Sequence, residues 1–373
     1  MASPWRGRST EKARGEQDRA ARMCAVVYNC AGGLLALAML TALAGPPSQA
    51  APGDDSTAAR AAPAAAGPAR DGGTALARGD AAQAIVLYSS ALEDANLPND
   101  RRAMILNDRA VAYARRGQTR LAFEDFNKAV QLFPEYAALY NNRGNLLLAV
   151  GQMKEAIKDF DRALVLAPGY AAAYNNRAGA LMKGGEFHSA IRDYTQAVRL
   201  LPAAAAPLSG RGLAHLQLGR PHAAIRDFTR AVLSDDRFAA GYRHRAEAKI
   251  AVGHFDEAIE DLSRAVAFDI DNPDMYVLRG RAYLAIDNRE AAIKDLSRAI
   301  ALDGRDAWAR LWRGEVLRRL GEWDAALADF DAALTRDKSL SWAHAGRADC
   351  LLGRGRPAEA LRAVDRSLRL QDS

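Results

Sequence analysis

Two stretches of the chain decide its fold: "AALYNNRGNLLLAVGQMKEAIKDF" at residues 137–160 and "AAYNNRAGALMKGGEFHSAIRDY" at residues 172–194. Both contain the tetrapeptide Tyr-Asn-Asn-Arg, which begins at Tyr140 in the first stretch and 34 residues later, at Tyr174, in the second. A period of this length is typical of proteins that stack one small helical unit many times. The two stretches therefore predict a repeat protein.

The period continues through most of the chain, which divides into eight rows from Ala103 onward. The eighth residue of every row is Gly or Ala, the twentieth is always Ala, and the twenty-seventh is Ala except for Ser367 in the last row. The twenty-fourth is Phe or Tyr in five rows and Leu or Val in three. A partial copy at residues 73–102 precedes the rows, which are 103–136, 137–170, 171–204, 205–238, 239–272, 273–306, 307–340 and 341–373.

Each row predicts two amphipathic helices, because apolar residues recur at helical spacing in both of its halves. Gly at the fifteenth position lets the chain turn between the two helices, and only the row with Asp287 lacks this Gly. The small residues allow the helices to approach closely, and the aromatic side chain fills the remaining space. These features predict an all-α fold of stacked helix–turn–helix units.

In its period and in these columns the chain resembles the tetratricopeptide-repeat family over residues 73–373. Pro134, Pro168 and Pro202 also match the proline that the family carries at position 32, although later rows lack it. The resemblance implies a right-handed α-solenoid, a superhelix whose first helices line a concave groove. It also implies that this groove holds peptide segments or other proteins.

Asparagines cluster at positions that face the groove in the family's geometry. An Asn side chain offers a donor and an acceptor, so it can pair with a peptide backbone of any sequence. The pattern is similar to the asparagine ladder of O-linked N-acetylglucosamine transferases, whose position 6 is occupied here by Asn142 and Asn176. The alternative is that the amides bond only the neighbouring helix. The candidate residues are Asn107, Asn141, Asn142, Asn145, Asn175 and Asn176.

Three tryptophans, Trp308, Trp312 and Trp342, stand at groove positions of the last two rows, near Arg318 and Glu315. Tryptophan and arginine are enriched among residues that dominate binding energy, so these rings are a second candidate anchor for a partner's apolar side chain. The alternative is that the tryptophans pack between helices in place of the family's Tyr at position 4. That position is Arg310 and His344 in these rows.

The family's grip on a C-terminal carboxylate is not expected in the first rows. Asn145 and Asn176 match two of the residues that it uses, but the places of its cations hold Asn141, Ala206 and Gly210. Without cations, a carboxylate would lose its charge-assisted hydrogen bonds. The sequence therefore argues against a clamp for chaperone tails.

Arginine occupies position 7 of all eight rows, and aspartate occupies position 23 of the first seven. The two columns lie at matching heights on facing helices, so we expect a ladder of structural ion pairs closer than about 6 Å. Arg347 has no such partner in its own row, because position 23 there is Ala363. The expected pairs are Arg109–Asp125, Arg143–Asp159, Arg177–Asp193, Arg211–Asp227, Arg245–Asp261, Arg279–Asp295 and Arg313–Asp329.

Residues 1–50 have the pattern of an export signal peptide. A basic region up to Arg22 precedes an apolar run, and small residues at Ser48 and Ala50 mark a cleavage site before Ala51. We favour cleavage, which predicts an exported protein, periplasmic or secreted in a bacterium. The alternatives are an uncleaved membrane anchor at residues 24–44 and a start at Met23. Residues 51–72 are rich in Ala, Pro and Gly and predict a flexible linker.

No motif in the sequence predicts catalysis, a metal site or a cofactor. The six histidines form no paired ligand motif, and Cys350 is the single cysteine beyond the predicted signal. The net charge of +6 is spread over mixed charges, which argues against nucleic acid as a partner. The sequence therefore predicts a non-catalytic scaffold or adaptor that binds protein or peptide after export. The alternative is an accessory or regulatory subunit of a cell-envelope enzyme.

The last row raises the question of what covers the end of the stack. Its final helix keeps Leu361, Leu368 and Leu370 beside charged residues, and an uncovered apolar end invites self-association. We therefore expect a weak homodimer through residues 341–373.

Overall fold

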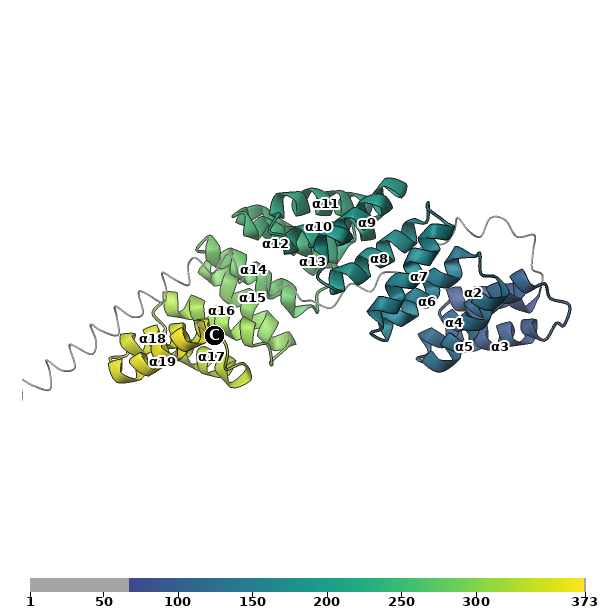
Figure 1. The fold of residues 1–373 in the computed structure, drawn as a ribbon. Helices are drawn as coiled ribbons and strands as arrows, with labels where there is room; N and C mark the ends of the chain where they lie inside the picture. The colour runs from purple at the N-terminus through teal and green to yellow at the C-terminus, as the bar shows by residue number, and fades with distance from the viewer. Residues whose placement is uncertain (1–66, 372–373) are drawn as a thin grey trace, which may run out of the picture. The chain divides into compact units, whose positions relative to one another are not determined.

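The structure, a computed structural model, describes residues 67–371, which form eighteen helices and no strand (Figure 1). The described residues divide into two compact units, 67–218 and 219–371. Within each unit, helices that follow one another in the chain pack against each other. The predicted all-α solenoid of helix–turn–helix repeats is thereby confirmed.

In the unit of residues 67–218, four helix pairs are followed by the first helix of a fifth (Figure 1, purple to teal). The helices are α2 (Pro68–Ala77), α3 (Ala81–Leu92), α4 (Asn99–Arg115), α5 (Thr119–Leu132), α6 (Ala137–Ala149), α7 (Met153–Leu166), α8 (Ala171–Lys183), α9 (Phe187–Leu200) and α10 (Ala205–Gln217).

In the unit of residues 219–371, the second helix of one row is followed by four complete pairs (Figure 1, green to yellow). The helices are α11 (Pro221–Ser234), α12 (Ala239–Ala251), α13 (Phe255–Phe268), α14 (Pro273–Ala285), α15 (Arg289–Leu302), α16 (Ala307–Arg319), α17 (Trp323–Arg336), α18 (Ser341–Gly353) and α19 (Pro357–Gln371).

The small residue at position 8 is required by the aromatic ring at position 24 of the same row. A Cβ atom placed on Gly144 would lie 2.7 Å from Cε1 of Phe160, and one placed on Gly314 would lie 3.0 Å from Cε1 of Phe330. Both rings are almost completely buried, and so are the alanines at positions 20 and 27 of the same rows. Because a packed interior tolerates little added volume, this column sets how closely the two helices of a pair approach.

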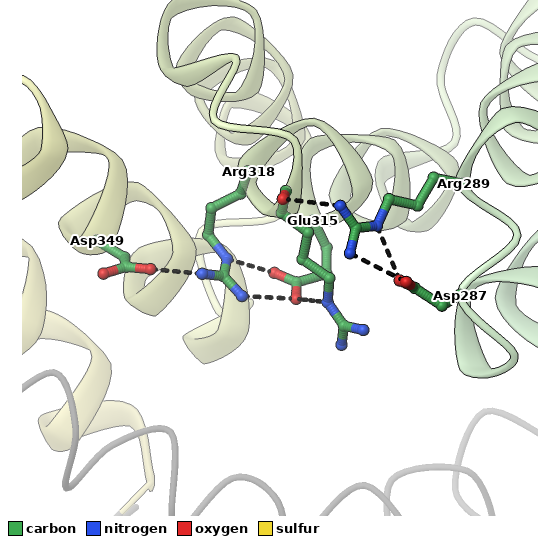
Figure 2. Close-up of polar contacts among 6 residues, drawn as sticks. Asp287, Arg289, Glu315, Arg318 and Asp349 are labelled. Atoms are coloured by element: carbon green, nitrogen blue, oxygen red, sulfur yellow. Dashed lines mark hydrogen bonds and ion pairs between the residues drawn. The ribbon is translucent and has the colours of Figure 1, made fainter.

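The turn inside each pair places one residue in the left-handed region of backbone conformation. Glycine fills this place in most rows, as at Gly151 (φ 81°) and Gly321 (φ 78°). In the sixth row it is Asp287 (φ 60°), the one non-glycine residue with positive φ in the described part of the chain. Asp287 Oδ1 accepts from Nε of Arg289 at 2.8 Å, and Oδ2 accepts from Nη2 at 3.1 Å (Figure 2).

The variant Asp287→Val is expected to lower the free energy of unfolding by about 1–2 kcal/mol, because a β-branched residue is strained at positive φ. Asp287→Gly should stay within about 0.5 kcal/mol of the wild type, since relief of backbone strain offsets the exposed ion pair with Arg289. Asp271→Val, at an exposed loop residue with ordinary φ, is the matched control. Urea unfolding followed by circular dichroism measures the differences. An equal loss in both valine variants would contradict the strain argument.

The first helix pair is complete, which corrects two sequence predictions. Helix α2 begins at Pro68, inside the predicted linker of residues 51–72, so the partial copy predicted at residues 73–102 begins earlier and is a full pair. Gly72 takes the small position: a Cβ atom on it would lie 2.8 Å from Cε1 of Tyr88. The Ala- and Gly-rich composition concealed this helix, because its packing depends on small residues rather than large apolar ones.

The residues that separate this copy from the regular rows lengthen a helix instead of forming a loop. Helix α4 has 17 residues, whereas its counterpart α6 has 13. Arg102 at the added turn donates from Nη1 to the carbonyl of Leu92 at 3.0 Å, which fixes the turn to the end of α3.

The predicted export signal at residues 1–50, and residues 51–66 of the predicted linker, lie outside the described residues. Across residues 67–371, no helix is both long enough and apolar enough to cross a membrane.

Helix α19 closes the second unit with a polar outer face. Val364 and Ser367 are buried against α18, and Oγ of Ser367 donates to the carbonyl of Ser341 at 2.9 Å. Arg362 and Arg366 are exposed. Within the described part of α19, no large apolar side chain is exposed. Leu361, Leu368 and Leu370 are each partly buried, and the homodimer through residues 341–373 stays a prediction.

Candidate functional site

The column of arginines forms two-pronged ion pairs with the column of aspartates. In six rows the Nε and Nη2 groups of the arginine donate to the two carboxylate oxygens over 2.5–2.9 Å. The bond to Asp159 raises the pKa of Arg143 above its ordinary value, although burial opposes this. The observed pairs are Arg109–Asp125, Arg143–Asp159, Arg177–Asp193, Arg245–Asp261, Arg279–Asp295 and Arg313–Asp329.

The same arginines also bond the preceding repeat, which the sequence analysis did not predict. Nη1 of Arg143 donates to Oδ1 of Asn127 at 2.9 Å, and Nη1 of Arg177 donates to Oδ1 of Asp161 at 2.6 Å. The acceptor is the residue at position 25 of the preceding row. This position carries a side-chain oxygen in all seven rows that precede another row, so the contact could have been predicted from the sequence. Its members are Asn127, Asp161, Thr195, Thr229, Ser263, Ser297 and Asp331.

Two arginines of the column differ from the others. Arg347, which has no aspartate in its own row, donates from Nε to Oδ1 of Asp331 in the preceding row at 2.6 Å. Arg211 and Asp227 belong to different units, so their pairing stays a prediction. Since the paired groups bond each other in the six observed rows, this column joins helices and repeats rather than offering charge to a ligand.

Five of the six candidate asparagines, all except Asn145, are linked in one continuous chain of side-chain hydrogen bonds on α4, α6 and α8. Nδ2 of Asn176 donates to Oδ1 of Asn141 at 2.9 Å, and Nδ2 of Asn142 donates to Oδ1 of Asn107 at 3.0 Å. Within each helix, neighbouring amides are joined as well: Asn175 donates to Asn176 at 3.4 Å and Asn141 donates to Asn142 at 3.2 Å.

The direction of this chain is set at its N-terminal end by Asp108. Nδ2 of Asn107 donates to Oδ1 of Asp108 at 3.1 Å, and an ionised carboxylate can only accept. The Oδ1 atom of Asn107 is then left to accept from Asn142, and the same reasoning orients each amide as far as Asn175. The chain ends there because position 6 of the next row is Gly210, which has no side chain to continue it.

The geometry is compatible with both interpretations of the asparagines. Asn107 and Asn141 are 7% and 4% exposed and bond neighbouring helices, as the alternative interpretation requires. Asn142 and Asn176 are partly exposed, and each uses one N–H and one lone pair within the chain, so a second donor and acceptor remain. Asn145, one turn further along α6, is exposed. A binding role for these six residues stays a prediction.

The three candidate tryptophans lie in different environments. Trp312 is 8% exposed and belongs to the apolar core of the second unit, and the ring of Trp342 packs 6.3 Å from it between centroids. Trp308, at the start of α16, is 40% exposed. Trp308 is therefore the most exposed of the three, Trp342 is partly exposed, and Trp312 is buried.

Arg310 and His344 themselves replace the tyrosine that the last rows lack. The hydroxyl of Tyr276 donates to the backbone carbonyl at position 32 of the preceding row at 3.0 Å. Nη2 of Arg310 lies 3.3 Å from the equivalent carbonyl of Gly304, and Nε2 of His344 lies 3.3 Å from that of Lys338. The tryptophans are therefore not substitutes for this tyrosine, although two of them pack against the core.

Arg281 on α14 is a residue of this region that the sequence analysis missed. Its guanidinium carbon lies 4.8 Å from the centroid of the Trp312 ring. Nε of Arg281 and Nε1 of Trp312 are both buried without a hydrogen-bond partner in the described structure. A buried donor without an acceptor costs about 1–3 kcal/mol. Burial lowers the pKa of Arg281, and the carboxylate of Glu247 opposes this shift. Arg281 is the ninth residue of its row, a position that faces the groove in the family's geometry, so the sequence could have indicated it as a candidate.

Two carboxylates in the rows on either side of Arg281, those of Glu247 and Glu315, already bond other side chains. Glu247 accepts from Nη1 of Arg243 at 2.9 Å, and its other oxygen lies 3.1 Å from Nδ1 of His244. The ring of His244 is buried, which lowers its pKa, so it is neutral and donates from Nδ1 to Glu247.

Glu315 on α16 is held by two arginines in the same way (Figure 2). Its oxygens accept from Nε and Nη2 of Arg318 at 2.8 Å and from Nε of Arg319 at 2.9 Å. Nη1 of Arg318 also donates to Oδ2 of Asp349 on α18 at 2.5 Å. This cluster links α16 to α18, and its carboxylates are satisfied by arginines rather than open to a cation.

Other chemistry is limited in the described part of the chain. Residues 67–371 contain no group of three or more His, Cys, Asp or Glu side chains that could hold a metal ion. Cys350 is buried, and burial raises the pKa of its thiol to about 12, so the thiol is protonated at neutral pH.

Solved structures with the same fold include several repeat proteins. The Cut9–Hcn1 hetero-tetramer of the APC/C matches with 18% identity and a TM-score of 0.56 over 74% of this chain and 55% of that chain. A tetratricopeptide repeat protein from Parabacteroides merdae matches with 20% identity and a TM-score of 0.51, over 67% and 99%. PilF of Pseudomonas aeruginosa matches with 18% identity and a TM-score of 0.54, over 58% and 99%. Identities this low show the fold alone. No curated protein sequence is significantly similar to this chain.

Two sequence profiles, both described as tetratricopeptide repeat, match the chain. One matches residues 137–170, and the other matches residues 175–242, 209–274 and 277–341. Proteins built from this repeat are generally scaffolds for protein interactions, and their fold is typically not catalytic. Since the profiles together match more than half of the 373 residues, and paired helices with the same packing columns run through residues 67–371, the chain belongs to the tetratricopeptide-repeat family.

Proposed function

We propose that this protein is a non-catalytic scaffold that binds an extended segment of a partner protein along the first helices of its repeats. The observation that carries the proposal is the chain of amides on α4, α6 and α8. Asn142 and Asn176 are its partly exposed members, and each retains one N–H and one lone pair beyond those used in the chain. A peptide backbone presents the same pair of groups at every residue.

The fixed direction of the amides supports backbone recognition. Because Asp108 orients Asn107, and each amide orients the next, the donors and acceptors do not need to reorganise when a partner binds. Groups that are held in place before binding lose less conformational entropy on association. Such an array would bind extended segments with little dependence on their side chains.

We also propose that the scaffold acts after export, in the periplasm or outside the cell if the organism is bacterial. The support is the basic region, apolar run and small-residue cleavage site at residues 1–50 of the sequence. If that segment is not cleaved, residues 24–44 would anchor the scaffold to a membrane.

The double variant Asn142→Ala/Asn176→Ala is expected to weaken binding of a captured partner at least tenfold, since it removes two charge-neutral bonding groups at the centre of the site. The partner is captured by the full chain from an envelope extract of its own organism and identified by mass spectrometry. Binding is then measured with the purified partner. A partner that brings enzyme activity with it would favour the accessory-subunit alternative.

A stability control is needed, because the double variant also leaves the buried amides of Asn107 and Asn141 partly unsatisfied, at about 1–3 kcal/mol. Ala129→Gly, in the second helix α5, destabilises the same unit without touching the amides. If Ala129→Gly weakens binding as much as the double variant does, the asparagines have only a structural role.

A further inference from the structure

Arg281 differs from the paired arginines around it. The arginines of the ladder bond an aspartate and a residue of the preceding repeat, whereas no described residue accepts a hydrogen bond from Arg281. Its Nε atom is buried, and the side chain as a whole is only partly buried, so its Nη ends are the part that a ligand can reach. The stacking on Trp312 holds the planar guanidinium in place.

The carboxylates in the neighbouring rows do not neutralise Arg281 directly. Glu247 attracts it at longer range, but its oxygens are occupied by Arg243 and His244. Glu315, in the next row, is occupied by Arg318 and Arg319. Arg281 is therefore a cation with free donors that has no ion-pair partner within the described residues.

The second orphaned donor lies in the same place. Nε1 of Trp312 has no acceptor, and the ring itself carries Arg281 on its face and Trp342 at 6.3 Å. A ligand that brings an acceptor to the guanidinium and an apolar group to the partly exposed ring of Trp342 would match the surface that this cluster presents.

We propose that Arg281, held against the ring of the buried Trp312, binds the side-chain carboxylate of an Asp or Glu in a partner segment, whose neighbouring apolar side chain packs against the partly exposed ring of Trp342. This inference rests on the proposed function, because it takes the acidic residue to belong to a partner segment, and every contact that it uses lies within residues 219–371. It goes beyond that function in two ways: the partner segment must contain an acidic side chain, and Arg281 is the residue that recognises it.

The charge of the surroundings favours a carboxylate over a phosphate group. A phosphate carries up to two negative charges and is usually held by several cations. Here only the guanidinium of Arg281 is available, because the neighbouring Arg243, Arg318 and Arg319 are already bonded to Glu247 and Glu315. A monoanion with two oxygens matches one planar guanidinium through paired hydrogen bonds.

The proposal is tested with an array of terminally blocked peptides, in which each acidic peptide is paired with a twin carrying Asn for Asp and Gln for Glu. The full-length protein is expected to favour the acidic member of binding pairs about tenfold or more. Arg281→Gln should remove this preference, and Arg281→Lys should keep part of it, because lysine preserves the charge but not the planar fork. Arg298→Gln, the same charge change at a half-exposed residue on α15, is the control and should bind as the wild type does.

Three outcomes would overturn the proposal. The first is that the wild type binds acidic and amide twins equally, or binds no peptide of the array. The second is that Arg281→Gln keeps the acidic preference while its thermal unfolding matches that of the control. The third is that binding requires an unblocked C-terminus, which would assign the site to a terminal carboxylate. In each case, loss of the captured partner by Asn142→Ala/Asn176→Ala would leave the proposed amide site standing, whereas retention of that partner by this double variant would count against the amide site as well.

Discussion

Replacing Asp261 by Ala is expected to lower the free energy of unfolding by about 3–5 kcal/mol, which is the cost of removing one partner from a buried ion pair. Asp261 is 3% exposed, and its oxygens accept from Nε and Nη2 of Arg245 at 2.8 and 2.5 Å. Nζ of Lys249 lies 2.9 Å from the same carboxylate. The variant would therefore leave two poorly solvated cations without this counter-ion. Urea unfolding followed by circular dichroism measures the loss, and hydrogen exchange shows whether α12 and α13 open first.

Two comparisons separate charge from packing in this prediction. Asp295→Ala should cost less than Asp261→Ala, because Asp295 pairs with Arg279 alone. The double variant Arg279→Met/Asp295→Leu should lie within about 1 kcal/mol of the wild type, because an apolar pair can replace a buried ion pair without leaving an unpaired charge. A double variant as unstable as Asp295→Ala would show that the pair acts through something other than its charge.

Replacing Phe330 by Ala is expected to cost about 3–5 kcal/mol through the cavity that it leaves. Phe330 is 1% exposed and lies between two glycines on neighbouring first helices. A Cβ atom on Gly314 would lie 3.0 Å from its Cε1, and one on Gly346 would lie 2.4 Å from its Cζ. The ring therefore fills space within its own pair and also between that pair and the next.

The same geometry predicts a compensating change. Gly346→Leu alone should cost about 1–3 kcal/mol, because the added side chain meets a ring that cannot move aside. In the double variant Phe330→Ala/Gly346→Leu, the leucine can enter the vacated space, so the loss should be at least about 1 kcal/mol smaller than the sum of the single losses. Leu233→Ala, at a residue that is 79% exposed, should change stability by less than about 0.5 kcal/mol. Additive losses would mean that Phe330 does not occupy the space beside Gly346.

Much of the fold could be predicted from the sequence because the same packing arrangement, a small residue facing an aromatic one, recurs in most rows. The small residue at position 8 and the aromatic one at position 24 belong to one pair of helices joined by a short turn. Their separation along the chain fixes their separation in space, and the same holds for Arg143 and Asp159. The first pair was misjudged where this arrangement depends on Gly72 alone, inside a stretch whose composition resembles that of a linker.

The candidate site was less predictable, because its contacts join different repeats. The asparagine column was visible in the sequence, but which amide donates to which depends on the contact between Asn107 and Asp108. The tryptophan column was visible as well, yet the sequence did not tell that Trp312 would be buried while Trp308 stays exposed.

The sequence by itself determined the family, the helix pairs, the turns and the ion pairs within six of the rows, because residues joined by one tight turn have little freedom in how they meet. The tertiary structure alone decided which groups remain without partners. Arg281 meets Trp312 across two repeats, and Arg310 and His344 reach carbonyls of the preceding row. Such contacts depend on the angle and distance at which one pair packs on the next, and these are set by the sum of all side chains between them rather than by any single spacing.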